Sequence, residues 1–123
     1  MILPLPRSVR VYVATAPANL RKSFEGLSNE VRGVLALDPL SGHVFLFLNR
    51  RRTQVKMLLF TRGGFTILHK RLERGRFTFP AQVVPEATRV EIEAHELSAL
   101  LEGLTPSTAK AARRWSPLFA AAR

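Results

Sequence analysis

Residues 43–79 read HVFLFLN RRRT QVKMLLF TRGG FTILHKRL ERG RFTF, in which apolar runs are separated by short polar connections. Each apolar run has the length and the composition of a β-strand. Connections this short join antiparallel neighbours. The stretch therefore predicts a central antiparallel β-meander with strands over 43–49, 54–60 and 65–72. The chain then turns into residues 76–79, where Pro80 ends any strand pairing.

The other expected elements flank this meander in the sequence. They are, in chain order, a strand over 9–13, an amphipathic helix over 20–35 with Asn19 as its N-cap, a turn over 38–42, a short strand over 89–92 and a second amphipathic helix over 95–104. The predicted fold class is α+β: an antiparallel β-meander sheet with an N-terminal and a C-terminal amphipathic helix.

Length and composition limit what the chain is. With 123 residues we expect a single domain over 1–104, followed by a basic tail over 105–123 that is either disordered or helical. The absence of cysteine excludes disulfides and thiolate metal sites and fits a reducing compartment. No apolar run approaches the roughly 18 residues that cross a bilayer, and none resembles a signal peptide. We expect a cytoplasmic protein without a membrane partner.

The formal net charge of +10 is concentrated in one part of the chain. Between positions 49 and 76 there are nine basic residues and one acid, Glu73. Such charge on a folded scaffold is typical of a polyanion-binding face, and we expect a nucleic acid as partner. The plainer alternative is a solvated sheet surface, but unbalanced like charges destabilise a compact state. The candidate nucleic-acid-binding residues are Arg50, Arg51, Arg52, Lys56, Lys70, Arg71, Arg74 and Arg76.

Meander geometry predicts how these charges are arranged. The turn at 50–53 and the turn at 73–76 should lie at the same end of the sheet, so that their five arginines form one ridge. Arg62 should lie at the opposite end. The side chain of Lys70 should point to the opposite face of the sheet from the side chains of His69 and Arg71. Phe77 and Phe79 have the spacing of core residues, although unpaired bases stack on such rings in other proteins.

Groups for catalysis are scarce. Asp38 is the only aspartate, and it lies in a turn. The glutamates at 91, 93, 96 and 102 are interpreted as the solvated side of the second helix. The histidines at 43, 69 and 95 fall in separate elements, without the cysteines or the close histidine pair of a zinc site. We therefore expect no catalytic residue, no metal and no cofactor.

Several ordered motifs resemble a known family. The segments are residues 19–27, NLRKSFEGL; residues 38–45, DPLSGHVF; residues 49–58, NRRRTQVKML; residues 70–77, KRLERGRF; and residues 97–103, LSALLEG. They are similar to the small accessory protein, the second open reading frame often called TnpB, of bacterial insertion-sequence-66 elements. The matching motif residues include Arg21, Lys22, Asp38, Pro39, Gly42 and Gly75. One departure is Asn19, where the family usually has aspartate.

The resemblance implies a non-catalytic role in DNA transposition beside a separate transposase. The partners that it implies are the DNA of the element ends and the transposase of the same element, or the message that encodes it. A different hypothesis remains open, in which the basic face is an interaction module that docks on an acidic surface of the transposase without binding DNA.

Overall fold

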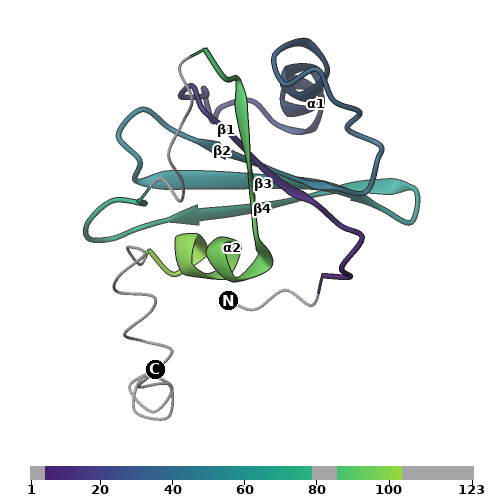
Figure 1. Cartoon of the computed structure of the whole chain (residues 1–123). Coiled ribbons are helices and arrows are strands. Elements are labelled where there is room, and N and C mark those ends of the chain that lie inside the picture. The colour runs from purple at the N-terminus through teal and green to yellow at the C-terminus, as the bar shows by residue number, and fades with distance from the viewer. Residues whose placement is uncertain (1–4, 79–85, 104–123) are drawn as a thin grey trace.

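The structure, a computed structural model, describes residues 5–78 and 86–103. Within these residues a five-stranded sheet lies between two helices (Figure 1). The elements in chain order are β1 (Val11–Ala14), α1 (Phe24–Gly33), β2 (Val44–Leu48), β3 (Gln54–Thr61), β4 (Gly64–Arg71), β5 (Arg89–Ile92) and α2 (Ala94–Leu101). The α+β class is confirmed. The boundary predicted at residue 104 and the predicted tail lie outside the described residues.

The antiparallel run predicted from residues 43–72 is present. β2 pairs with β3 in a register that places Leu46 opposite Met57, and β3 pairs with β4, placing Met57 opposite Leu68. All five residues of β2 are buried, as its continuous apolar sequence predicts for a strand covered on both faces. The β3–β4 hairpin turns through Arg62 and Gly63, whose φ angles are +48° and +81°.

The prediction of an antiparallel meander is wrong for the sheet as a whole, because β1 pairs with β2 in parallel. The strand order is β4-β3-β2-β1-β5, with β5 antiparallel to β1 at the edge. Helix α1 lies between β1 and β2 in the chain and supplies the long crossover that parallel neighbours require. The predicted N-terminal helix is not confirmed as such, because α1 lies between two strands that pair with each other in the sheet.

Helix α1 also begins later than the 20–35 range predicts. The side chain of Asn19 accepts a hydrogen bond from the Arg21 backbone N–H (3.0 Å), and its carbonyl accepts one from Lys22 (3.1 Å). These bonds form a local turn, so the polar residue that resembled an N-cap lies one turn too early. Ser23 occupies the N-cap position instead.

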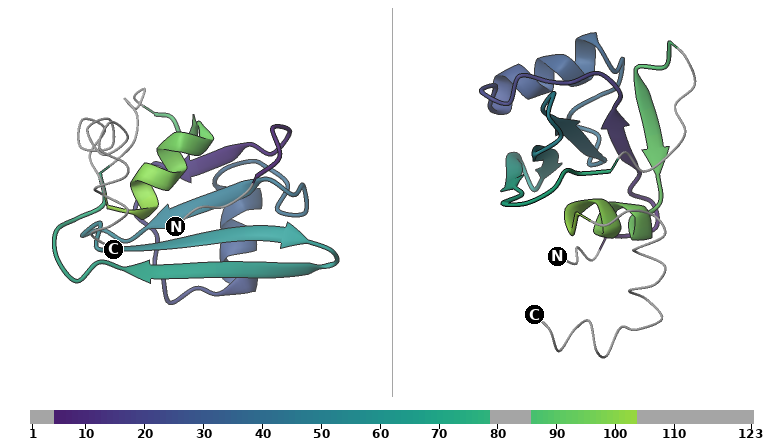
Figure 2. Two further views of the ribbon diagram at one scale, coloured as in Figure 1. Left: turned by 90° about the horizontal axis from the view of Figure 1, so that it is seen from below. Right: turned by 90° about the vertical axis from the view of Figure 1, so that its left-hand side faces the viewer.

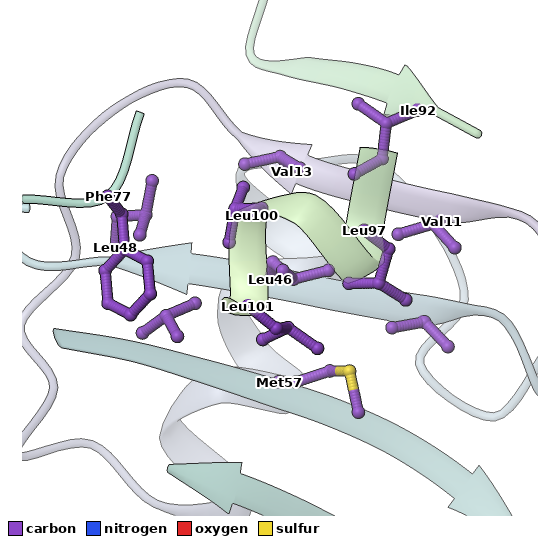
Figure 3. Packing of buried hydrophobic residues seen from close by; sticks show 12 residues of the cluster. Val11, Val13, Leu46, Leu48, Met57, Phe77, Ile92, Leu97, Leu100 and Leu101 are labelled. Carbon is purple, nitrogen blue, oxygen red and sulfur yellow. The ribbon is translucent and has the colours of Figure 1, made fainter. Parts of the chain in front are cut away.

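The two helices cover opposite faces of the sheet (Figure 2). Leu27 and Val31 of α1 pack on the face that presents Phe45 and Leu58. On the other face, the α2 residues Leu97, Leu100 and Leu101 pack on side chains such as those of Leu46 and Met57 (Figure 3). Helix α2 begins at a capping box in which Glu93 and Glu96 each bind the other's backbone N–H.

The turn at 38–42 is confirmed and sets the start of β2. The Asp38 side chain accepts a hydrogen bond from the Leu40 N–H (2.9 Å), and the Asp38 carbonyl accepts one from Ser41 (3.1 Å). Pro39 is buried. Gly42 has φ +85°, a left-handed conformation that other residues adopt at a cost. These motif residues therefore have a structural role.

Residues 76–78 do not form a strand, and Phe79 lies outside the described residues. Instead, the Phe77 N–H donates to the Arg52 carbonyl (2.6 Å), and the Phe77 ring is 1% exposed in the core cluster under α2. Figure 3 shows this ring beside Leu48. The core interpretation of Phe77 is confirmed, and the ring fixes the segment that carries Arg74 and Arg76 to the end of the sheet.

Replacing Phe77 by alanine should lower the free energy of unfolding by about 3–5 kcal/mol, because it leaves a cavity in a closed part of the core. Urea denaturation followed by circular dichroism measures this change. The matched control is Phe24→Ala, at a ring that is 47% exposed, which should cost less than about 1 kcal/mol. Equal losses for the two variants would contradict this account of Phe77.

Candidate nucleic-acid interface

The β2–β3 turn is organised by the side chain of Asn49. Its Oδ1 accepts hydrogen bonds from the backbone N–H groups of Thr53 and Gln54, both at 2.9 Å, and its Nδ2 donates to the Thr53 hydroxyl at 3.0 Å. The Asn49 carbonyl accepts a further bond from the Arg52 N–H (3.0 Å). The turn that carries Arg50, Arg51 and Arg52 is thus closed by one amide.

The segment after β4 is bonded to this turn through the backbone. The Leu72 N–H donates to the Thr53 carbonyl (2.8 Å), in addition to the Phe77 bond described above. Gly75 has φ +75° and permits the reversal between these two attachment points. The two segments lie at the left-hand end of the sheet in Figure 1, and the Arg62 hairpin lies at the right-hand end. We call Arg50, Arg51, Arg52, Arg74 and Arg76 the arginine ridge.

Four of the five ridge arginines have no carboxylate partner within the part of the chain that the structure describes. All five arginines are exposed. Among the residues that the structure describes, no ion pair or side-chain hydrogen bond involves Arg50, Arg51, Arg74 or Arg76. The nearby Glu73 carboxylate pairs with Arg71 at 3.5 Å, between side chains that are 67% and 81% exposed. An ion pair so exposed contributes little to stability and neutralises little of the ridge.

Lys56 and Lys70, also predicted as binding residues, lie on opposite faces of the sheet. The Lys56 ammonium group donates to the Lys22 carbonyl (2.9 Å) just before α1. The Lys70 ammonium group donates to the Leu101 carbonyl (2.5 Å) at the end of α2, where a positive charge complements the helix dipole. Both lysines therefore attach helices to the sheet, and neither belongs to the ridge.

His69 and Arg71 lie on the same face as Lys56. The Nε2 atom of His69 lies 2.8 Å from the Gln54 side-chain oxygen. Partial burial of the imidazole lowers the pKa of His69 below its usual value, and the positive charges of Lys56 and Arg71 lower it further. The neutral imidazole is thus favoured at neutral pH, and Lys56 and Arg71 are the neighbouring cations that favour it.

The carboxylates near α2 have local structural partners. Glu91 pairs with Arg10 at 3.8 Å, and Glu93 and Glu96 form the capping box. His43 accepts a hydrogen bond from the Arg10 N–H through Nδ1 (3.0 Å). Within residues 5–78 and 86–103, no three acidic or histidine side chains are grouped closely enough to hold a metal ion. No helix in the same ranges has the length and apolar character needed to span a membrane.

Comparison with known proteins places this arrangement in a family. The model of the family described as IS66 Orf2-like protein matches residues 9–111. The chain belongs to this family. It is 36% identical over 103 residues to an uncharacterized protein of Sinorhizobium fredii, y4hO, with 84% of this chain and 87% of that protein covered. A second uncharacterized protein of the same bacterium, y4jC, is 34% identical over 98 residues, which cover 80% and 81%. No solved structure matches the chain.

The resemblance stated from the motifs is thereby confirmed. An IS66 Orf2-like protein is a transposition-associated accessory protein, and the family is not known as a catalytic enzyme.

The IS66 family motif at residues 19–27 has a structural explanation. The Lys22 ammonium contacts the Glu30 carboxylate, so its side chain runs along the first turns of α1. A Cβ atom on Gly26 would lie 2.8 Å from the Lys22 Cβ, and glycine leaves space for that path. Arg21 is exposed and donates its backbone N–H to Asn19. An aspartate at position 19 accepts the same bond, which explains why asparagine is tolerated there.

Two features of this site were not predicted from the sequence. The first is Asn49, which belongs to the quoted family motif but was assigned no role. Asn49 lies between a buried strand and three arginines, at the start of a turn. Asparagine side chains often bind backbone groups in turns, and this position is the signal from which its role could have been predicted. The second is a small pocket beside the turn, whose other wall comes from residues 14–17. That wall lies far away in sequence, and its proximity depends on the parallel pairing of β1 with β2.

Replacing Asn49 by alanine should lower the free energy of unfolding by about 2 kcal/mol or more, because it removes three side-chain hydrogen bonds and leaves turn N–H groups without their acceptor. Urea denaturation measures this change. The control is Asn29→Ala, at an exposed position of α1, which should stay within about 0.5 kcal/mol of the parent protein. A neutral Asn49→Ala variant would contradict the proposed role of this amide.

His69 should titrate below its usual value of 6.5, and Arg71→Gln should raise its pKa because one repelling charge is removed. The folded-state pKa lies below the unfolded-state value, so the unfolded chain binds this proton first as the pH falls. Stability should therefore rise with pH between the folded-state pKa and about 6.5. Proton-detected NMR titration of the imidazole measures both values, and a pKa of 6.5 or above in the parent protein would refute the assignment.

Proposed function

We propose that this IS66 Orf2-like protein assists transposition without catalysing it, by binding nucleic acid through the arginine ridge. The DNA of the element is the intended ligand, and the transposase is the protein that it assists. One observation carries the proposal. Exposed guanidinium groups from two separate segments gather at one end of the sheet, and four of them have no carboxylate partner among the described residues.

The cost of this arrangement supports a ligand. Like charges that lie close together repel, and no described interaction compensates four of the ridge arginines. The backbone nevertheless holds their two segments together through the hydrogen bonds of Leu72 and Phe77. Phosphate groups relieve the repulsion, and guanidinium groups bind phosphate oxygens in a bidentate geometry that suits a polynucleotide backbone.

The position of the ridge favours contact with the nucleic-acid backbone over readout of base sequence. The five ridge arginines lie in the turn after β2 and in the segment after β4, so none of them lies on a helix that could enter the major groove. Phe77 is buried and does not stack on a base. The proposal therefore assigns to the ridge a salt-dependent affinity that depends little on sequence.

Duplex DNA binding measured by fluorescence anisotropy across a salt series tests the proposal. If the four unpaired arginines each neutralise one phosphate, log K should fall with log salt with a slope of about −3.6, at roughly 0.9 per phosphate. The double variant Arg74→Gln/Arg76→Gln should make the slope less steep by about 1.8. Parallel series with single-stranded DNA and RNA identify the preferred nucleic acid.

The matched control is the double variant Arg32→Gln/Arg62→Gln, which removes the same charge from α1 and from the opposite end of the sheet. It should change the slope by less than half as much as the ridge variant. Equal effects of the two double variants would show that net charge alone drives binding. Failure to bind any nucleic acid at low salt would overturn the proposal and favour docking on an acidic surface of the transposase.

A further inference from the structure

A pocket of about 180 Å³ opens beside the arginine ridge, at the carboxyl ends of the parallel strands β1 and β2. One wall is formed by the last residue of β1 and the residues after it, and the other by the last residue of β2 and the residues after it. The lining residues are Ala14, Thr15, Ala16, Pro17, Leu48, Asn49, Arg50 and Arg52. Two ridge arginines therefore line the pocket, and no acidic side chain does.

Hydrogen bonds hold both walls in place. The Thr15 hydroxyl donates to the Ala87 carbonyl (2.6 Å), and the Thr15 N–H donates to the Thr88 carbonyl (3.0 Å). The Ala18 N–H donates to the Leu48 carbonyl (2.8 Å), which joins the first wall to the end of β2. The second wall is the turn that Asn49 closes. A pocket with fixed walls loses little entropy when a ligand binds.

The size and the chemistry of the pocket restrict its ligand. Its volume is well below the roughly 300–1,000 Å³ of clefts for drug-sized ligands. A recess of this size suits a group of a few heavy atoms better than a whole nucleoside. The alanines at 14 and 16 leave this space open, and the Arg50 guanidinium at its rim has no partner among the described residues.

We infer that this pocket binds a single phosphate group, supplied by the nucleic-acid strand that follows the ridge. The inference rests on the proposed function and makes it more specific: the ridge binds the backbone along its length, and the pocket receives one phosphate. A strand end carrying a phosphate monoester enters a recess more easily than an internal phosphodiester, which has a sugar on each side. A strand end with a terminal phosphate is therefore the expected form, and a 5′-phosphate is the probe for it.

Two probes test the inference. The first is inorganic phosphate, titrated into the protein at constant ionic strength set with chloride and followed by backbone amide NMR. Amide shifts should concentrate at Thr15, Ala16 and Asn49. The second is a pair of single-stranded oligonucleotides that differ only in a 5′-phosphate or a 5′-hydroxyl. The phosphorylated strand should bind more tightly, on the order of tenfold, as expected for a charge-assisted contact of guanidinium with phosphate.

Three variants separate the pocket from the ridge. Ala16→Leu adds three carbon atoms at the pocket wall without changing any charge, and Arg50→Gln removes a lining cation. Both should abolish the phosphate-induced shifts and the preference for the 5′-phosphate. Arg51→Gln is the matched control, because Arg51 lies in the same turn and does not line the pocket. It should keep both signals, even if its affinity for duplex DNA falls.

The outcomes are distinct. Phosphate-induced shifts that Ala16→Leu leaves unchanged, or that spread over the basic surface without concentrating at the pocket, would overturn the inference. If duplex binding to the ridge persists in that case, the proposed function stands without it. Localised shifts with equal affinity for the two oligonucleotides would keep the phosphate site and refute the strand end as its source. If the parent protein binds no nucleic acid at all, the proposed function itself is refuted.

Discussion

The hydrogen bonds of the Asn49 side chain are the constraint on which the functional end of the molecule depends. A turn between two strands leaves backbone N–H groups without strand partners, and buried or half-buried N–H groups are costly unless they find acceptors. Asn49 supplies one oxygen that satisfies two of them. The closed turn then presents its Thr53 and Arg52 carbonyls to the segment after β4. The Asn49 amide thus stabilises the turn that carries Arg50, Arg51 and Arg52, and the same turn binds the segment that carries Arg74 and Arg76.

The conformation of Arg52 costs this turn some stability. Its φ angle of +58° lies in the left-handed region, which costs a residue with a side chain roughly 1 kcal/mol or more and costs glycine little. Ala36, Arg62 and Glu86 also adopt such angles, so the angle by itself does not mark the turn as a functional surface. Two backbone hydrogen bonds hold Arg52 in this conformation: its N–H donates to the Asn49 carbonyl, and its carbonyl accepts from the Phe77 N–H.

Sequence periodicity predicted β2, β3 and β4 well because each run pairs with its neighbour in the chain. It predicted the end of the sheet at which Arg50 and Arg74 lie for the same reason. The parallel pairing of β1 was not accessible, since a strand of four residues indicates burial and not the identity of its neighbour. The start of α1 was misplaced because Asn19 closes a turn with the same chemistry that it would use as an N-cap.

Side-chain alternation had a similar limit at the candidate site. It correctly separated Lys70 from the face that presents His69, but it contains no information about what covers each face. The structure supplies that information. Lys56 donates to the Lys22 carbonyl and Lys70 to the Leu101 carbonyl, although both lysines were predicted from the sequence to bind nucleic acid. A basic residue in a strand under a helix terminus has an acceptor available within the fold. Four of the five ridge arginines, in turns at the end of the sheet, have no such acceptor among the described residues. The turn arginines therefore stay candidates for binding, whereas the two lysines do not.

The ridge and the pocket share one wall, and this shared wall relates the fold to the proposed chemistry. The carboxyl ends of β1 and β2 lie side by side because the two strands are parallel, and ligands of open α/β sheets generally bind at such ends. The β2–β3 turn begins at the same place and carries cations over it. An antiparallel pairing of β1 with β2 would bring the amino end of β1 to this turn, without the segment 15–17 that forms the second wall. The mixed sheet, which the sequence pattern did not reveal, is therefore what brings a recess of phosphate size beside a row of arginines.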